Sequence, residues 1–217
     1  MSEQSQLDLR ILGFEPGDEI AGARKIMLRT SRGEIPMMMH AAKNPARAVL
    51  CVSGAIGGFD GPAMLYPRLG LELPVAEVGV LRLNYRIPND FDECLIDALA
   101  ALTFLKGVGY GRVALIGHSF GGAVAINAGT LSEAVTTVIA VSSQLAGAQV
   151  VANLKPRPLL LIHGTADTIL PDECSKLLYR RASEPKTLKL FEGAGHRLNE
   201  VREELFTTVR EWVLSKT

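Results

Sequence analysis

The sequence Val113-Ala-Leu-Ile-Gly-His-Ser-Phe-Gly-Gly122 joins an apolar run directly to a helical pattern. Such a run is typical of a strand that is buried on both faces. The pattern Gly-x-Ser-x-Gly after a strand and before a helix is typical of a sharp turn that holds a serine in a strained, exposed position. Side chains at 117 and 121 would collide with the neighbouring strand and helix. The stretch therefore predicts a strand–turn–helix unit that presents Ser119 as a candidate nucleophile.

Similar apolar runs and helical patterns recur on both sides of this unit. We expect strands at 46–52, 78–83, 111–116, 135–141, 158–163 and 188–191, helices at 91–105, after Ser119, at 172–181 and at 198–213, and a hairpin of 25–30 with 34–40. A hairpin followed by alternating strands and helices predicts an α/β fold with a doubly wound, mostly parallel sheet and an antiparallel N-terminal hairpin. Functional residues of such a sheet lie at the carboxyl ends of its strands.

The 217 residues are interpreted as a single domain, 1–217, in which 1–24 form an N-terminal extension whose structure the pattern leaves open. The interval 142–157 between two predicted strands has room for one short helix. We therefore expect no cap domain.

Charge and composition limit the partners of the chain. The 23 Lys and Arg residues balance 23 Asp and Glu residues, and this net charge of zero argues against a nucleic-acid partner. No window approaches the ~18 apolar residues that cross a membrane, and residues 1–6 are polar and carry no secretory signal. Three cysteines cannot all pair, which favours reduced thiols. We expect a cytoplasmic protein without a membrane partner, and the oligomeric state stays open.

A serine nucleophile requires a base, and the chain has four histidines. His40 lies in the predicted hairpin and is interpreted as structural. His118 points away from Ser119 or forms a wall of the pocket, and His163 ends a strand, where packing or a loop hydrogen bond is expected. His196 follows a Gly-Ala-Gly loop after the last strand, and such a loop can bring an imidazole over the sheet edge. His196 is the candidate base.

The base requires a carboxylate that fixes its tautomer. Asp167 follows the strand at 158–163 and is the candidate acid. Asp172 leads into a predicted helix, where capping gives it an adequate structural role, whereas Asp167 has no comparable local role. The order Ser119, Asp167, His196 is the chain order of the α/β-hydrolase triad and not that of chymotrypsin-like or subtilisin-like chains.

Small residues at 53–58 follow another predicted strand. They would let backbone N–H groups face the nucleophile, and the expected oxyanion donors are the N–H groups of Ala55 and Phe120. No G-x-G-x-x-G or P-loop string is present, so a nucleotide site is not predicted.

Four motifs together resemble the α/β-hydrolase superfamily, in its small dienelactone-hydrolase-like or carboxylesterase-like branch. They are SGAIGG at 53–58, GHSFGG at 117–122, HGTAD at 163–167 and GAGH at 193–196. The resemblance covers about residues 25–215 and implies an eight-stranded sheet, a serine-hydrolase mechanism, no metal and no cofactor. Dienelactone hydrolases carry a cysteine where this chain has Ser119.

We expect hydrolysis of a carboxylic ester or thioester of small to medium size through an acyl-enzyme intermediate. The small-molecule ester is expected to contact loop residues at the same sheet edge, namely Phe59, Tyr85, Arg86, Leu145 and Ile169. Two alternatives remain open. One is acyl transfer or perhydrolysis with the same three residues, and the other is a ligand receptor or scaffold that retains the fold with little turnover.

Overall fold

The computed structural model describes residues 8–217, so the polar residues 1–6 lie outside it. The described residues form one nine-stranded sheet in the order β1-β2-β3-β5-β4-β6-β7-β8-β9. The strands are β1 (Ile11–Ile20), β2 (Ala23–Thr30), β3 (Gly33–His40), β4 (Arg47–Val52), β5 (Val78–Leu83), β6 (Arg112–His118), β7 (Val135–Val141), β8 (Leu159–Gly164) and β9 (Lys186–Phe191). Strands β4 to β9 are parallel to one another. β1 pairs antiparallel with β2, β2 with β3, and β3 with β5.

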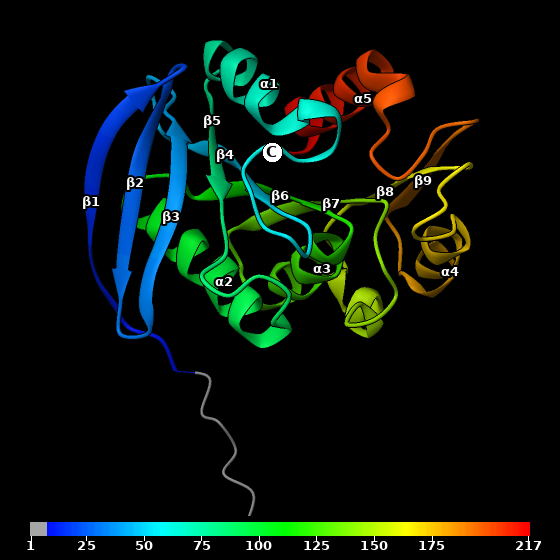
Figure 1. Ribbon diagram of the computed structural model, residues 1–217, viewed down its shortest axis with the longest axis horizontal. Coiled ribbons are helices and arrows are strands. Elements are labelled where there is room, and N and C mark those ends of the chain that lie inside the picture. Colours follow the sequence, from blue (N-terminus) through cyan, green and yellow to red (C-terminus); the bar gives the residue numbers. More distant parts are fainter. Residues whose placement is uncertain (1–7) are drawn as a thin grey trace, which may run out of the picture.

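Helices cover both faces of the sheet (Figure 1). They are α1 (Leu65–Glu72), α2 (Phe91–Gly107), α3 (Phe120–Leu131), α4 (Glu173–Arg181) and α5 (Arg202–Lys216), with 3-10 turns at Pro62–Met64, Leu73–Ala76, Gln149–Leu154 and Asn199–Val201. One apolar core lies under α1 and α5, and the other lies under α2, α3 and α4. The predicted doubly wound, mostly parallel sheet with an antiparallel start is confirmed. The interval 142–157 holds only the turn Gln149–Leu154.

The N-terminal strand β1 was not predicted, and it makes the sheet one strand larger than the resemblance implied. Most of its side chains are exposed, and it contains both Gly13 and Pro16. It therefore lacks the apolar alternation by which a half-buried strand is recognised. The predicted hairpin is consequently part of a three-stranded antiparallel unit.

Helix α1 was missed because Pro67 and Gly70 interrupt its helical pattern. Gly70 is required by packing: a Cβ there would lie 2.3 Å from Cδ2 of His40. The ring of His40 is buried under α1, which agrees with its interpretation as a structural residue.

Candidate active site

Ser119 lies on the sharp turn between β6 and α3. Its backbone has φ 57° and ψ −121°, a left-handed φ that side-chain-bearing residues rarely adopt, and its N–H donates to the Val141 carbonyl oxygen at 2.8 Å. A Cβ at Gly117 would lie 1.9 Å from the carbonyl oxygen of Gly121, and a Cβ at Gly121 would lie 2.2 Å from that of Ser53. The expectation that both glycines are required by close packing is therefore confirmed.

The loops after β8 and β9 bring Asp167 and His196 together. Oδ2 of Asp167 lies 2.7 Å from Nδ1 of His196, while Oδ1 accepts the backbone N–H groups of Ile169 at 2.8 Å and Leu170 at 2.9 Å. Burial alone would raise the pKa of the Asp167 carboxyl, but the Leu170 N–H, the His196 ring and the Ile169 N–H together hold that pKa below its ordinary value. The expectation that Asp167 has no local role is wrong, because it also closes its own turn.

A close approach of two loops makes this pairing possible. A Cβ at Gly164, which ends β8, would lie 2.1 Å from the carbonyl oxygen of Ala194. Glycine at this position therefore lets the loop that carries His196 lie directly against the end of β8. The Ala166 N–H donates to the same Ala194 carbonyl oxygen at 2.9 Å, which fixes the two loops to each other.

His163 makes a second contact with the Asp167 carboxylate. Its Nε2 lies 3.1 Å from Oδ2 of Asp167 and 3.0 Å from the carbonyl oxygen of Leu170, and its Nδ1 lies 2.7 Å from Oγ of Ser175. Because both partners of Nε2 are acceptors, Nε2 carries a proton and donates to them. The predicted loop hydrogen bond of His163 is therefore present, and it steadies the candidate acid.

His118 forms a wall of the site, which was one of its two expected roles. Its ring centroid lies 4.8 Å from that of His196, and its Nε2 lies 3.1 Å from the His196 carbonyl oxygen. Burial lowers the pKa of His118 to about 4, so the ring is neutral near pH 7 and Nε2 donates to that carbonyl. This contact holds the backbone of the His196 loop.

The burial of two histidines leads us to expect that the stability of the fold depends on pH. Burial lowers the pKa of both His40 and His118 from 6.5 to about 4. Between these values the unfolded chain binds protons that the folded chain does not, so the free energy of unfolding should fall as pH decreases, by up to about 1.4 kcal/mol per pH unit for each ring. Urea unfolding measured from about pH 7 down to about pH 4 checks this slope. His40→Gln should reduce this slope of unfolding free energy against pH. An unchanged slope in that variant would contradict the lowered pKa of His40.

Ser119 and His196 open into one cavity of about 580 Å³. Of the predicted substrate contacts, Phe59 and Ile169 line it, whereas Tyr85, Arg86 and Leu145 do not. Tyr85 is buried with its ring edge-on to Phe120, and Leu145 packs against the core under α2 and α3. Wall residues that were not predicted include Ile56 and Arg197, which neighbour the predicted Ala55 and His196 in sequence.

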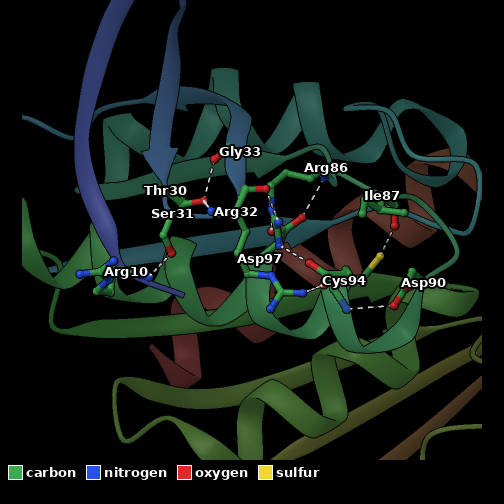
Figure 2. Close-up of polar contacts among 11 residues, drawn as sticks. Arg10, Thr30, Ser31, Arg32, Gly33, Arg86, Ile87, Asp90, Cys94 and Asp97 are labelled. Atoms are coloured by element: carbon green, nitrogen blue, oxygen red, sulfur yellow. Dashed lines mark hydrogen bonds and ion pairs between the residues drawn. The ribbon is translucent and has the colours of Figure 1, made fainter. Parts of the chain in front are cut away.

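Arg86 is a structural residue at the N-terminal end of α2 (Figure 2). Its side chain is 5% exposed and contacts the carboxylates of Asp97 and Glu93, and its Nη1 donates to the carbonyl oxygen of Arg32 at 2.9 Å. Asp97 is fully buried and requires a cation beside it. The expectation that Arg86 contacts substrate is wrong, because its guanidinium is already occupied by these partners.

Asp172 was expected to cap the helix that follows it. It directly precedes α4, but its carboxylate makes no capping hydrogen bond and lies 3.0 Å from Nζ of Lys176. The backbone of Asp172 is itself helical, with φ −59° and ψ −18°, whereas a capping side chain normally requires an extended residue. Asp172 is therefore a surface ion-pair residue.

The predicted oxyanion donors lie beside Ser119. A Cβ at Gly54 would lie 3.7 Å from the Cβ of Ser119, which shows how closely the loop after β4 approaches the serine. Ala55 lines the cavity, and Phe120 begins α3 directly after Ser119. No hydrogen bond to another described residue occupies the N–H of Ala55 or Phe120.

Residues 8–217 contain no cluster of three His, Cys, Asp or Glu side chains arranged to hold a metal ion. In the same range, no helix has the length and apolar character needed to cross a membrane.

A mostly parallel sheet with a serine on the turn after β6 and an Asp–His pair on the loops after β8 and β9 defines an α/β hydrolase. Residues 86–209, more than half of the chain, match the model of the phospholipase/carboxylesterase family. The chain belongs to that family.

Solved structures share the fold at low sequence identity. Est1E from Butyrivibrio proteoclasticus has a TM-score of 0.76 at 15% identity, over 88% of this chain and 98% of that one. A dienelactone hydrolase from Anabaena variabilis has a TM-score of 0.76 at 16% identity, over 93% and 98%. An alpha-beta serine hydrolase homologue from Coxiella burnetii has a TM-score of 0.70 at 20% identity, over 85% and 96%.

Curated relatives match over shorter stretches. The protein YfhR of Escherichia coli is 46% identical over 50 residues, which is 23% of this chain and 18% of YfhR. Caffeoylshikimate esterase of Arabidopsis thaliana is 42% identical over 65 residues, 27% of this chain and 20% of that protein. The chain thus spans only about a fifth of the length of the curated relatives that it matches.

Proposed function

We propose that the protein is a serine hydrolase that cleaves a carboxylic ester or thioester of small to medium size through an acyl-enzyme intermediate. The observation that carries this proposal is the 2.7 Å contact between His196 Nδ1 and Asp167 Oδ2 beside a cavity that Ser119 also lines. A carboxylate at Nδ1 keeps the proton on that nitrogen, which leaves Nε2 of His196 as the basic nitrogen for a serine hydroxyl.

The reaction follows from these positions. Oγ of Ser119 attacks the carbonyl carbon while its proton passes to Nε2 of His196, and the N–H groups of Ala55 and Phe120 donate to the oxyanion. The tetrahedral intermediate collapses, the carbon–oxygen or carbon–sulfur bond breaks, and His196 returns the proton to the leaving group. Water then attacks the acyl-serine with His196 again as base, which releases the acid and regenerates Ser119.

Asp167 supports this cycle because it remains ionised. Its lowered pKa keeps a negative charge beside the imidazolium that forms when His196 accepts the proton. His163 and two backbone N–H groups fix the carboxylate in place, so His196 is oriented before substrate binds.

The substrate class is supported by the cavity and by the relatives. Phe59, Ile56 and Ile169 give the cavity apolar walls, and its volume of about 580 Å³ suits a small or medium ester. The name of the Arabidopsis relative states an esterase, and the matched family is described as phospholipase and carboxylesterase.

A panel of p-nitrophenyl esters and acyl thioesters tests the proposal. We expect saturable hydrolysis of the acetate or butyrate near neutral pH, because the cavity admits a short acyl group beside Ser119. Circular dichroism controls for folding. A folded protein that hydrolyses no ester or thioester of the panel would contradict the proposed function and favour a receptor.

A further inference from the structure

A second cavity, of about 420 Å³, lies between Phe59 and the three N-terminal strands. Its walls include Pro16 of β1, Met27 of β2, and Pro36 and Met38 of β3. Its size falls within the range of small-molecule sites in proteins. None of these four residues belongs to the site described above.

Strand pairing places three apolar side chains of this cavity on one face. Met27 is opposite Pro36 across β2 and β3, and Lys25 is opposite Met38. Directly opposed residues share a face, as do residues two apart on one strand, so Met27, Pro36 and Met38 point to the same side. Met27 and Met38 are each only partly buried. Sδ of Met38 accepts from Nη2 of Arg82 at 3.4 Å, so the flexible thioether of Met27 is the one available to a ligand.

The second cavity adjoins the catalytic one at a single side chain. Phe59 lines both cavities, and it belongs to the same loop after β4 as Ala55. In the sheet, β3 and β2 lie three and four strand spacings from β6, about 14 and 19 Å, so only a long acyl chain bound at Ser119 extends past Phe59 onto the face formed by Met27, Pro36 and Met38.

The proposed chemistry indicates which arm of the ester takes this direction. His196 protonates the leaving group, so the alcohol or thiol oxygen or sulfur must face the loop of His196. The acyl arm leaves the carbonyl carbon on the side away from Nε2 of His196, and Phe59 is the wall residue that the two cavities share. The rim of the second cavity carries exposed Glu15 and Lys25, one charge of each sign, which favours an uncharged occupant.

We propose that the cavity formed by Phe59, Pro16, Met27, Pro36 and Met38 is an acyl-chain subsite for uncharged, apolar acyl groups that are too long for the catalytic cavity. This subsite rests on the proposed function, and it makes esters of long acyl chains better substrates than acetates. Methionines suit such a role because their unbranched side chains adapt to chains of different shape.

Substitution of Met27 tests the subsite. In the wild type, kcat/KM for p-nitrophenyl esters should rise from acetate to dodecanoate. Met27→Trp fills the cavity and should lower kcat/KM for the dodecanoate by at least about tenfold while it changes the acetate value by less than about twofold. Met27→Lys, which introduces a charge without a large ring, should act in the same direction and serves if the tryptophan variant does not fold.

Glu34→Trp is the matched control, because Glu34 lies on β3 on the same face as Pro36 and Met38 but lines neither cavity. It should leave the hydrolysis of both esters unchanged, since its side chain is exposed. A wild-type profile that is flat with chain length, or equal losses on acetate and dodecanoate in the Met27 variants, would overturn the subsite while acetate hydrolysis upholds the proposed function. If dodecyl acetate responds to Met27→Trp and the dodecanoate does not, the assignment to the acyl arm is wrong.

Discussion

Ser119→Ala should abolish ester hydrolysis, with a loss of about 10⁵–10⁶-fold in kcat, and should leave the fold intact. The hydroxyl is the only group removed, and no hydrogen bond from Oγ of Ser119 to another described residue holds it in place. The backbone hydrogen bond from its N–H to Val141 and the packing of Gly117 and Gly121 do not depend on the hydroxyl. Activity and thermal midpoint, measured on the same preparation, check both parts of this expectation.

Ser132→Ala is the matched control for that variant. Ser132 follows the last residue of α3, the helix that Ser119 precedes, and it lies outside the catalytic cavity. Its loss should leave kcat unchanged. Near-wild-type hydrolysis by Ser119→Ala would show that the nucleophile has been assigned to the wrong residue.

Asp167→Asn should lower kcat by about 10⁴-fold, as in other enzymes in which the acid of a triad is converted to an amide. The amide oxygen can still accept the N–H groups of Ile169 and Leu170, so the local turn survives. The NH₂ group of the new amide then takes the place of Oδ2 opposite the N–H at Nδ1 of His196. Two hydrogen-bond donors therefore face each other. His196 must move its proton to Nε2, and this removes the lone pair that accepts the proton of Ser119.

The stability of Asp167→Asn should decrease only modestly. His163 loses Oδ2 as an acceptor for its Nε2 proton but retains the carbonyl oxygen of Leu170 at 3.0 Å. The thermal midpoint of the variant, measured beside its kcat, separates a failure of catalysis from a failure of folding.

Asp172→Asn should give the opposite result. Asp172 pairs with Lys176 in a partly exposed ion pair and makes no contact with His196, so its loss should cost about 0–1 kcal/mol of unfolding free energy and leave kcat unchanged. An inactive Asp172→Asn beside an active Asp167→Asn would mean that the acid has been misassigned.

The positions of Ser119, Asp167 and His196 could be predicted because each follows a recognisable strand or lies in a short motif. The carboxyl ends of parallel strands meet at one sheet edge, so knowledge of the strands was sufficient to place the loops together. The distance of 2.7 Å between Oδ2 of Asp167 and Nδ1 of His196 agrees with this expectation.

The walls of the cavity were less predictable, because loop position does not give side-chain direction. Arg86 lies in a loop at the correct edge, but its guanidinium pairs with Asp97, eleven residues later on α2. Nothing in the sequence around Arg86 shows that the Asp97 carboxylate is fully buried and faces it. Similarly, Asp172 has the residue type of a helix cap, but its helical backbone directs the carboxylate to Lys176 instead.

The second cavity could not be predicted from the sequence at all. It requires β1, whose exposed side chains give no strand pattern, and it requires the register that places Met27 opposite Pro36. The turn of a hairpin sets its register. The observed turn leaves two residues, 31–32, between the strands where the prediction left three, so the predicted pairing is shifted by one residue.

Labelling with a fluorophosphonate tests most directly whether Ser119 is the nucleophile. The reagent forms a stable phosphonyl ester with a serine that is activated by a base, and peptide mapping by mass spectrometry locates the adduct. We expect a single adduct per chain, on Ser119, with ester hydrolysis lost in proportion to the labelled fraction. An adduct on a different residue, or complete labelling of Ser119 with hydrolysis unchanged, would contradict the mechanism.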